Sequence, residues 1–447
     1  MKTIGKYEIR GLLGRGGMGR VYKVSVPVIG KIAALKRLEP HPHLVSLLGE
    51  TGVRNRFIAE AATLAGIRHP QVVGIHDYDT DDEGRPFYLM GYWFNNLGVM
   101  MGETYRTEAP SRVLPLDRAV HYTRQILSGL ACLHHFGVVH RDIKPYNILL
   151  TEYDSVKICD FGLSKVRGET FDRPESLKVG SPFYAAPEQE ADPDEAGPAA
   201  DLYAVGVTLY RMLTGTLPDD DPVLPSRLNP DLDWKWDGFM LRAIARPPQK
   251  RFESARRMRD ELDRLMADWE ARREEICRIY PVPELPPAGG STRCRDRCIK
   301  VRPADAVQSF GTDELLRPLT SVRNDFEVRR DGTVADRVTR LLWEQSGSEY
   351  PLTFAGASDY LAALNQRRLA DRTDWRLPTV DELSTLLRPV SHGEALCIDP
   401  VFDERQKRIW SCDRRSFVAA WFVSIDLGFI GWEDRTGHFY VRGVCSI

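Results

Sequence analysis

The sequence predicts a multidomain α+β protein, and three observations carry that prediction. The chain has 447 residues, about three times the ~150 residues of a typical domain. The segment 281–290, PVPELPPAGG, holds closely spaced prolines and a glycine pair, which can neither continue a helix nor fill a strand. On both sides of this break, stretches that alternate apolar and polar residues occur beside stretches with apolar residues three or four apart, the patterns of strands and of helices.

The composition is that of an ordinary globular protein. Hydrophobic residues make up 43% of the chain, charged residues 28%, and the net charge is −2. These totals exclude wholesale disorder and give no sign of attachment to nucleic acid or to an anionic membrane surface. No run of about 18 apolar residues occurs, and the N-terminus lacks the apolar core of a secretory signal. We therefore expect a cytoplasmic protein with no membrane span and no nucleic-acid partner.

The eight cysteines are scattered along the chain, which predicts reduced thiols rather than a disulfide scaffold. Cys294 and Cys298 are close in sequence, but two further ligands are not nearby, so a metal site there is disfavoured.

The break divides the chain into three expected parts. These are a domain over 1–280, a linker over 281–311 and a second domain over 312–447. Before the break, residues 252–279 have the apolar spacing of a helix. We expect its early turns to complete the core of the first domain, while its later turns offer a short dimerisation helix and hence a homo-oligomer.

Near the N-terminus, residues 7–24 read as two strands joined by a glycine-rich turn. Gly14, Gly16 and Gly19 form G-x-G-x-x-G, followed by Val21. A backbone without Cβ atoms can lie over a polyphosphate and offer its N–H groups. Because the motif leads into a second strand rather than a helix, it favours a lid over nucleotide phosphates over a dinucleotide-binding fold.

Several further motifs follow in a fixed order. Lys36 ends an apolar strand, and a lysine that holds phosphates needs a carboxylate to position it, which Glu60 supplies from a predicted helix. The others are His140-Arg141-Asp142-Ile143-Lys144-Pro145-Tyr146-Asn147, then Asp160-Phe161-Gly162, then Ala186-Pro187-Glu188.

With these motifs, residues 5–270 resemble the protein-kinase family, specifically bacterial Ser/Thr kinases similar to the eukaryotic ones. The resemblance implies a bilobal fold, with lobes at about 1–92 and 93–280. It also implies use of ATP and Mg²⁺, with Mn²⁺ as an alternative, and a protein substrate phosphorylated on Ser or Thr.

The resemblance assigns each catalytic residue a task. Lys36 would hold the α- and β-phosphates, oriented by Glu60, and Asp142 would accept the proton of the substrate hydroxyl. Asn147 and Asp160 would hold two Mg²⁺ ions. Lys144 would neutralise charge on the transferred phosphoryl group, as in Ser/Thr rather than tyrosine kinases.

The same resemblance implies a nucleotide site and its supports. The nucleotide-binding candidates are Gly14, Arg15, Gly16, Gly17, Gly19, Val21, Ala34, Lys36 and the hinge residues Met90, Gly91, Tyr92 and Trp93. Gly91 departs from the family, in which an acidic residue is common; since adenine is recognised by backbone groups, binding should survive. Asp201 is expected to brace the catalytic loop, and Arg251 to pair with Glu188.

Arg141, immediately before Asp142, raises a regulatory hypothesis, because a phosphate on the activation segment could satisfy its charge. The candidate phosphorylation sites are Thr170, Ser176 and Ser181, of which we favour Ser176. The alternative is a solvated loop whose charged residues have no such role.

Residues 312–447 show no kinase pattern and read as a small α+β unit. The succession VTRLLWEQ, DWRLPTVDELSTLL, IWSC, AAWFVSI and YVRGVCSI resembles the DUF1566 (Lcl C-terminal) family, which has a C-type-lectin-like fold. Some relatives are variable proteins of diversity-generating retroelements, whose hypermutated segment would correspond to residues 411–435. The resulting ligand-binding candidates are Arg414, Arg415, Phe417, Trp432, Asp434, Arg435 and His438. The alternative is that the aromatic residues are core and the charges solvated surface.

Two hypotheses of different classes remain. In the first, an active kinase carries a C-terminal domain that binds an unknown ligand or partner. In the second, the lectin-like domain is the working part and the kinase fold is a non-catalytic scaffold. Asp142→Ala abolishes function under the first and leaves it intact under the second.

Overall fold

The computed structural model describes residues 2–103, 109–161, 165–166, 183–191, 196–279, 294–388 and 397–447. The chain forms two compact units, Met1–Asp268 and Trp269–Ile447, called the N-terminal and C-terminal units below. The expected break at 281–290 lies outside the described residues.

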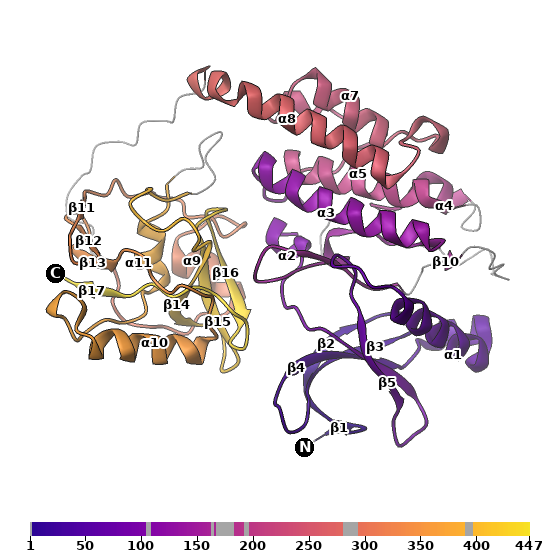
Figure 1. Cartoon of the computed structure of the whole chain (residues 1–447), viewed down its shortest axis with the longest axis horizontal. Helices are drawn as coiled ribbons and strands as arrows, with labels where there is room; N and C mark the ends of the chain where they lie inside the picture. Colours follow the sequence, from indigo (N-terminus) through magenta and orange to yellow (C-terminus); the bar gives the residue numbers. More distant parts are fainter. Residues whose placement is uncertain are drawn as a thin grey trace. The chain divides into compact units, whose positions relative to one another are not determined.

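A six-stranded antiparallel sheet opens the N-terminal unit (Figure 1). In spatial order its strands are β1 (Thr3–Ile4), β2 (Tyr7–Arg15), β3 (Gly19–Ser25), β4 (Ile32–Leu38), β6 (Pro86–Met90) and β5 (Ile75–Thr80). One face buries Leu35 and Phe87, and the other buries Tyr88 against Phe57 of helix α1 (Pro42–Gly66). Since side chains alternate along a strand, Lys36, which pairs with Tyr88, lies on the α1 face.

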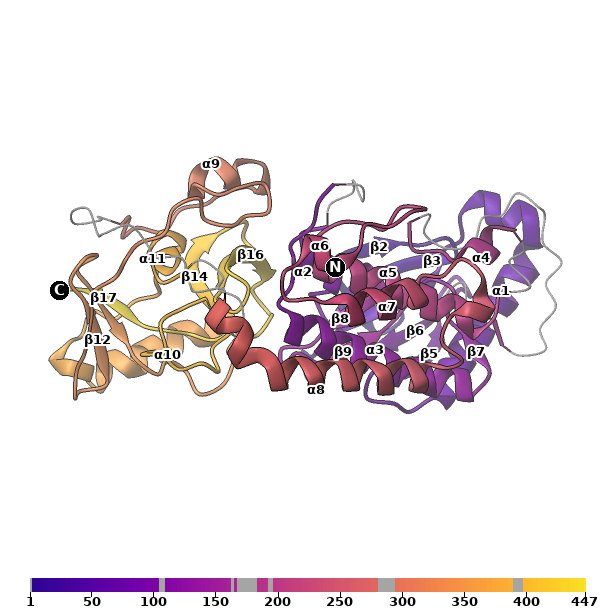
Figure 2. The ribbon, with the colours of Figure 1, turned by 90° about the horizontal axis from the view of Figure 1, so that it is seen from above.

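Helices make up most of the rest of this unit (Figure 2). They are α2 (Leu97–Met101), α3 (Leu116–His135), α4 (Pro187–Ala191), α5 (Pro198–Thr214), α6 (Pro225–Leu228), α7 (Trp234–Ala243) and α8 (Ala255–Ile279), with the 3₁₀ helices η1 (Pro145–Asn147) and η2 (Pro248–Lys250). Helix α5 packs against α3 and α7 and is buried from Ala200 to Thr214 except at Tyr203. Two short antiparallel pairs join the helices, β7 (Val138–Val139) with β10 (Lys165–Val166) and β8 (Ile148–Leu150) with β9 (Val156–Ile158).

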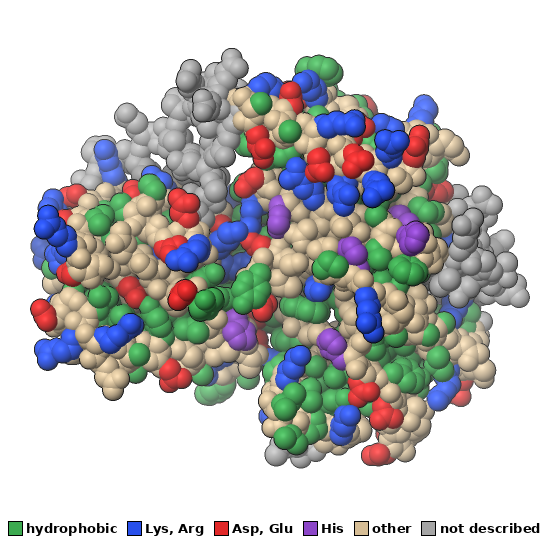
Figure 3. Space-filling view, viewed as in Figure 1, with side chains coloured by type: hydrophobic (Ala, Val, Ile, Leu, Met, Phe, Trp, Pro, Cys, Tyr) green, Lys and Arg blue, Asp and Glu red, His purple; other side chains and the backbone are tan. Residues whose placement is uncertain are grey.

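Helix α8 confirms the helix expected over 252–279, and Met258 and Leu262 of its early turns are buried. The boundary between the units, after Asp268, lies inside this helix and before the expected boundary at 280. Figure 3 shows basic and acidic side chains interspersed over α8, in keeping with the small net charge. Among the described residues, no helix is long and apolar enough to cross a membrane.

The C-terminal unit contains two antiparallel sheets and short helices. One sheet has the order β11 (Phe326–Val328), β12 (Thr333–Asp336), β13 (Leu341–Glu344) and β17 (Val444–Ser446); the other is β14 (Arg408–Arg414), β15 (Ala419–Ser424) and β16 (Phe429–Asp434). The helices are η3 (Pro303–Asp305), α9 (Ala306–Phe310), α10 (Phe354–Gln366), η4 (Leu369–Asp371) and α11 (Val380–Thr385). Trp343, Trp421 and Leu383 are buried in a core that both sheets and α11 share.

The structure corrects the expected linker over 281–311. From residue 294 on, this segment belongs to the folded C-terminal unit, where Val301 and Ala306 are buried in the core. The carbonyl of Val301 accepts a hydrogen bond from Trp421 Nε1 at 3.1 Å. Arg295 donates to both carboxylate oxygens of buried Asp413, at 2.8 and 2.9 Å. The sequence could not predict these contacts, because residues 294–311 follow a proline-rich stretch and their partners lie more than a hundred residues away.

Candidate functional site

The glycine-rich turn joins β2 and β3, where Gly16 N donates to Gly19 O at 2.8 Å. A Cβ at Gly14 or Gly17 would meet no atom within 4 Å, so the space beside the turn is open. At Gly19, in contrast, a Cβ would lie 2.2 Å from the carbonyl oxygen of Arg37, so the packing of β3 against β4 itself requires glycine there. The turn thus combines one structurally required glycine with exposed backbone that can approach a ligand.

Lys36 and Glu60 form a buried ion pair. Lys36 Nζ donates to Glu60 Oε1 at 2.7 Å, and their side chains are 7% and 3% exposed. The hydroxyl of Tyr88 donates to the same oxygen at 2.9 Å. Burial alone would lower the pKa of Lys36, but the charge of Glu60 and further contributions from Tyr88 and Asp160 raise it well above its usual value. Lys36 is therefore a charged ammonium held in one position.

Asp160 links this pair to the second part of the site. Its Oδ1 accepts a hydrogen bond from Lys36 Nζ at 3.3 Å, while half of its side chain surface, 50%, stays exposed. The charge of Lys36 lowers the pKa of Asp160, against the opposing effect of burial. Its backbone has a φ of +62°, in the left-handed region, and the next residue, Phe161, packs against the ring of His140. The result is an ionised carboxylate directed at open space.

The loop after β7 gathers the other predicted catalytic residues. Asp142 Oδ2 accepts hydrogen bonds from Lys144 Nζ at 2.8 Å and from Asn147 Nδ2 at 3.0 Å. Asn147 Nδ2 also donates to the backbone carbonyl of Asp142 at 2.7 Å. These bonds fix the orientation of the Asp142 carboxylate, and they bring together three side chains that the sequence motif placed within six residues.

Asp201 braces this loop from helix α5, as expected. Its carboxylate accepts hydrogen bonds from the backbone N–H groups of His140 at 2.9 Å and Arg141 at 2.8 Å, and lies 2.8 Å from His134 Nε2. His140 is fully buried, accepts from Asp142 N through Nδ1 and donates through Nε2 to the carbonyl of Cys159. It thus connects the loop to Cys159, the residue that follows β9.

The predicted pair of Glu188 and Arg251 is also present. The guanidinium binds both carboxylate oxygens, at 2.6 and 2.7 Å, and the side chain of Arg251 is fully buried. A neighbouring buried network was missed by the sequence analysis. In it, Tyr184 donates to Glu103, whose carboxylate lies 3.7 Å from Arg211. Since its members are far apart in sequence and form no recognisable spacing, no local signal could have revealed it.

The hinge follows β6, whose last residue Met90 pairs with Ala34. Trp93 folds back over Gly91 so closely that a Cβ there would lie 2.3 Å from its ring. This packing gives a physical reason for the glycine at position 91. Thr170, Ser176 and Ser181, the candidate phosphorylation sites, lie outside the described residues.

The described residues fit a nucleotide and a hard divalent cation. Asn147 and Asp160 present an amide and a carboxylate, whose oxygens are the ligands Mg²⁺ prefers. Open backbone at Gly14 and Gly17 and the fixed ammonium of Lys36 suit a polyphosphate. The arrangement offers positioning, charge neutralisation and a proton acceptor, the requirements of phosphoryl transfer.

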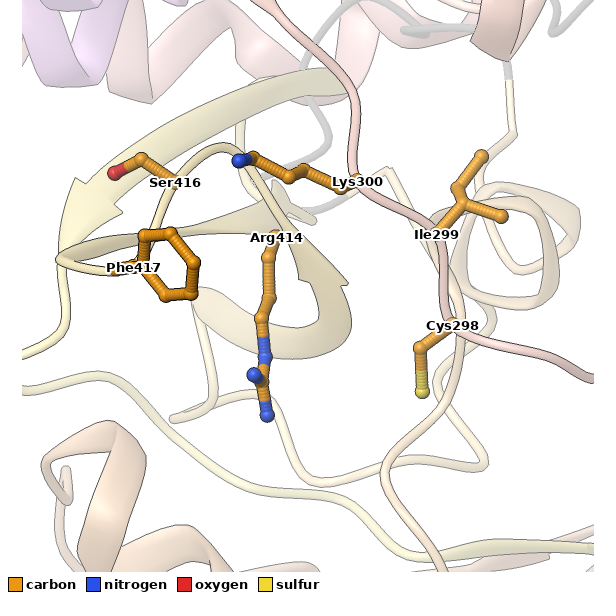
Figure 4. A pocket seen from close by; sticks show the side chains of 6 residues that line it. All are labelled: Cys298, Ile299, Lys300, Arg414, Ser416 and Phe417. Atoms are coloured by element: carbon orange, nitrogen blue, oxygen red, sulfur yellow. The ribbon is translucent and has the colours of Figure 1, made fainter.

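In the C-terminal unit, several of the candidate ligand-binding residues contact one another or line one pocket. The guanidinium of Arg415 lies over the ring of Trp432, 3.5 Å from its centroid. Phe417, 83% exposed, and Arg414 line a pocket of about 280 Å³ (Figure 4). Arg435 donates to the carbonyl of Phe417.

Other members of that set lie elsewhere, and some lining residues were not predicted. Asp434 caps its own turn by accepting from Thr436 at 2.9 Å, and His438 is exposed without lining the pocket. The unpredicted lining residues are Cys298, Ile299, Lys300 and Ser416. The first three fall in the supposed linker, and the bridge that pairs Lys300 with Arg414 brings them to the site. The same parallel bridge sets Cys298 opposite Cys412, and their thiols interact.

Comparison with known proteins finds a matching family model within each unit. Residues 7–265 match the protein kinase domain, and residues 332–445 match the Lcl C-terminal domain, which confirms both resemblances. The serine/threonine-protein kinase PksC of Streptomyces coelicolor is 34% identical over 60% of this chain and 50% of its own length. The serine/threonine-protein kinase pkn3 of Myxococcus xanthus is 33% identical over 61% of this chain and 52% of its own.

Among solved structures, the kinase domain of PknI from Mycobacterium tuberculosis is 28% identical and covers 59% of this chain and 96% of that domain, with a TM-score of 0.45. The chain spans about half the length of the first two relatives. Since the kinase match covers more than half of the chain, and its motifs meet in one site, the chain belongs to the protein kinase family.

Proposed function

We propose that the chain is a serine/threonine protein kinase that uses ATP with Mg²⁺. The observation that carries this proposal is the Lys36–Glu60 pair at 2.7 Å, with Asp160 3.3 Å from the same ammonium. In kinases this pair and the metal-binding aspartate must both be in place for transfer. Here both are present in one arrangement, and the relatives' names indicate the same activity.

In the proposed reaction, Asp142 accepts the proton of a Ser or Thr hydroxyl. The hydroxyl oxygen forms a bond to the γ-phosphorus while the bond from that phosphorus to the β–γ bridging oxygen breaks, and ADP leaves. Lys144, 2.8 Å from Asp142, places a positive charge beside the transferred group. Mg²⁺, when bound at Asn147 and Asp160, would neutralise charge that develops on the phosphates.

The test is transfer of labelled γ-phosphate by the full chain with Mg²⁺, with Ser/Thr-containing proteins as acceptors. Asp160→Asn should abolish transfer. Asp82→Asn, the same chemical change at an exposed turn, should leave it intact. No phosphate transfer by the unaltered chain with either Mg²⁺ or Mn²⁺ would contradict the proposal and favour the scaffold hypothesis.

We also propose that the C-terminal unit is a C-type-lectin-like module that binds a ligand at the pocket around Phe417. Figure 4 shows Arg414 between Phe417 and Cys298, with Lys300 reaching toward Ser416. The ammonium of Lys300 lies 4.9 Å from the Phe417 ring. Two cations beside an exposed aromatic ring suit a ligand with a carboxylate on an aromatic or apolar group.

Benzoate is a suitable probe for this second proposal. Its binding to the full chain, followed by ligand-observed NMR, should weaken in Arg414→Ala and Phe417→Ala. It should persist in Arg330→Ala, a control at an exposed position that does not line the pocket. Equal binding by all variants would contradict the site.

Diversification of residues 411–435 by a retroelement, and association through α8, stay predictions. Sister sequences that differ in residues 411–435 and lie beside a reverse transcriptase gene would support the diversification.

A further inference from the structure

A second cavity, of about 560 Å³, lies in the N-terminal unit and is not lined by the glycine-rich turn. Its walls come from the end of α1, the loop over 67–74, β5, the start of β4, the hinge and β9. It shares only the hinge residues Gly91, Tyr92 and Trp93 with the nucleotide-binding candidates. Neither Lys36 nor Asp160 lines it, so it is separate from the site of phosphoryl transfer.

The cavity is basic. Lys31, Arg68 and Lys157 line it, together with His69 and His76, and none of its lining residues is acidic. Within the described ranges, no ion pair joins any of the three cations to a carboxylate. Other surface cations of this unit have such partners, for example Lys235 with Asp268 at 2.9 Å. The cavity therefore concentrates positive charge that the protein does not neutralise.

Backbone pairing holds Lys157 in this wall. Ile158 N donates to the carbonyl of Gln71 at 2.8 Å, and Val73 N donates to the carbonyl of Ile158 at 3.0 Å. These bonds fix the loop after α1 alongside β9, so that His69 and Lys157 face the same space. The backbone pairing thus fixes the positions of His69 and Lys157 in the wall, while Lys31, Arg68 and His76 line the cavity as exposed side chains.

Burial and neighbouring cations both disfavour further positive charge in this cavity. Burial, followed by the charge of Lys157, lowers the pKa of His69; burial, followed by Lys31 and Lys157, lowers the pKa of His76. Burial also lowers the pKa of Lys157. His69 Nδ1 accepts from Gln71 N at 3.2 Å, which leaves Nε2–H as a donor. An anion in the cavity would relieve this repulsion and accept hydrogen bonds.

Trp93 adds a flat apolar wall. Its ring lies over Gly91, and the ammonium of Lys157 is 5.5 Å from its centroid. An aromatic surface beside several cations suits an organic group that carries a compact dianion better than it suits a bare inorganic ion.

We propose that this basic pocket, built by Lys31, Arg68, Lys157, His69, His76 and Trp93, binds a phosphate monoester attached to an organic group. A phosphorylated small molecule and a phosphorylated Ser or Thr side chain share this chemistry. The pocket is a binding site in its own right and requires no phosphoryl transfer by the chain.

The test uses the full chain with its nucleotide site filled by a non-hydrolysable ATP analogue and Mg²⁺. Phenyl phosphate and a phosphoserine peptide are titrated separately by calorimetry, with phenol and the unphosphorylated peptide as uncharged counterparts. Lys157→Met and Lys31→Met should each weaken binding of the phosphorylated probes about tenfold or more. Lys250→Met, which removes an exposed lysine elsewhere in the unit, should not change it.

Tighter binding of the peptide would identify a protein ligand, and tighter binding of phenyl phosphate a small molecule; both support the pocket. Three results would overturn the proposal. They are no binding of either phosphorylated probe by the unaltered chain, the same affinity in Lys157→Met as in the unaltered chain, and the same affinity for phenol as for phenyl phosphate. Lys31 is exposed, so its variant tests the proposal even if Lys157→Met unfolds. Because binding is measured without catalysis, the pocket and the proposed kinase activity can fail independently.

Discussion

Trp93 lies against the backbone of Gly91 so closely that a Cβ at position 91 would fall 2.3 Å from the indole ring. The hinge therefore has a glycine for a packing reason, and the same ring forms a wall of the basic pocket. One residue pair thus accounts for the glycine of the hinge and forms part of a cavity that the motifs do not reveal.

Gly91→Ala should destabilise the N-terminal unit. The added methyl group forces Trp93 to move, and overpacking of this kind costs about 1–3 kcal/mol. Urea unfolding measures the loss. In a Trp93→Leu background, which frees the space, the same substitution should cost much less, because the two effects are coupled. Equal costs in both backgrounds would show that the ring is not the obstacle.

Glu60→Gln should impair catalysis more than folding. It removes the charge that holds Lys36 in place, and loss of one preorganised charged contact lowers kcat by about 10²–10³-fold. Phosphate transfer at saturating ATP measures the effect, with Glu253→Gln at an exposed position as the matched control. An unchanged kcat in Glu60→Gln would show that the Lys36–Glu60 pair is not needed for phosphate transfer.

Arg251→Met should be strongly destabilising. It leaves the Glu188 carboxylate, only 18% exposed, without its bidentate partner, and breaking a buried pair costs about 3–5 kcal/mol. Arg257→Met, at an exposed position of α8, is the control. Similar unfolding midpoints for the two variants would contradict the importance of the buried pair.

The Asp201 brace predicts a particular pH dependence. Burial would raise the pKa of Asp201, but hydrogen bonding and charge from His134, with further contributions from His140 and the Arg141 N–H, lower it overall. The unfolded chain therefore binds the proton at higher pH than the folded chain, so the stabilisation is present above the unfolded pKa of ~3.9 and is lost as pH falls through the folded value.

Urea unfolding of the unaltered chain and Asp201→Asn at several pH values measures this dependence. The stability difference between them should be largest near neutral pH and shrink below about pH 4. A difference that stays constant down to pH 3 would show that the carboxylate charge is not what stabilises the loop.

The contacts of residues 294–311 predict where the C-terminal unit begins. A fragment over 294–447 should unfold cooperatively, whereas one over 312–447 lacks Val301, Ala306 and the Arg295–Asp413 pair and should not fold stably. Thermal unfolding followed by circular dichroism distinguishes them. Equally cooperative unfolding of both fragments would show that residues 294–311 are not needed for folding, as the sequence analysis expected of a linker.

How far the sequence could predict the molecule depends on how local each signal is. Lys36, Asp142 and Asp160 belong to short motifs with fixed neighbours, so their meeting in one site could be expected. Arg295 and Lys300 resemble linker residues until β14 is placed beside them. The basic pocket joins Lys31 to Lys157 across distant strands, a proximity that no periodicity encodes.

The most direct test of the proposed kinase activity is to map phosphorylated residues by mass spectrometry after the full chain is incubated with ATP and Mg²⁺ beside an acceptor protein. The account predicts phosphate on Ser or Thr of the chain or the acceptor, absent when Asp142→Ala replaces the unaltered chain. No phosphorylated residue with the unaltered chain, or the same sites modified by Asp142→Ala, would contradict it.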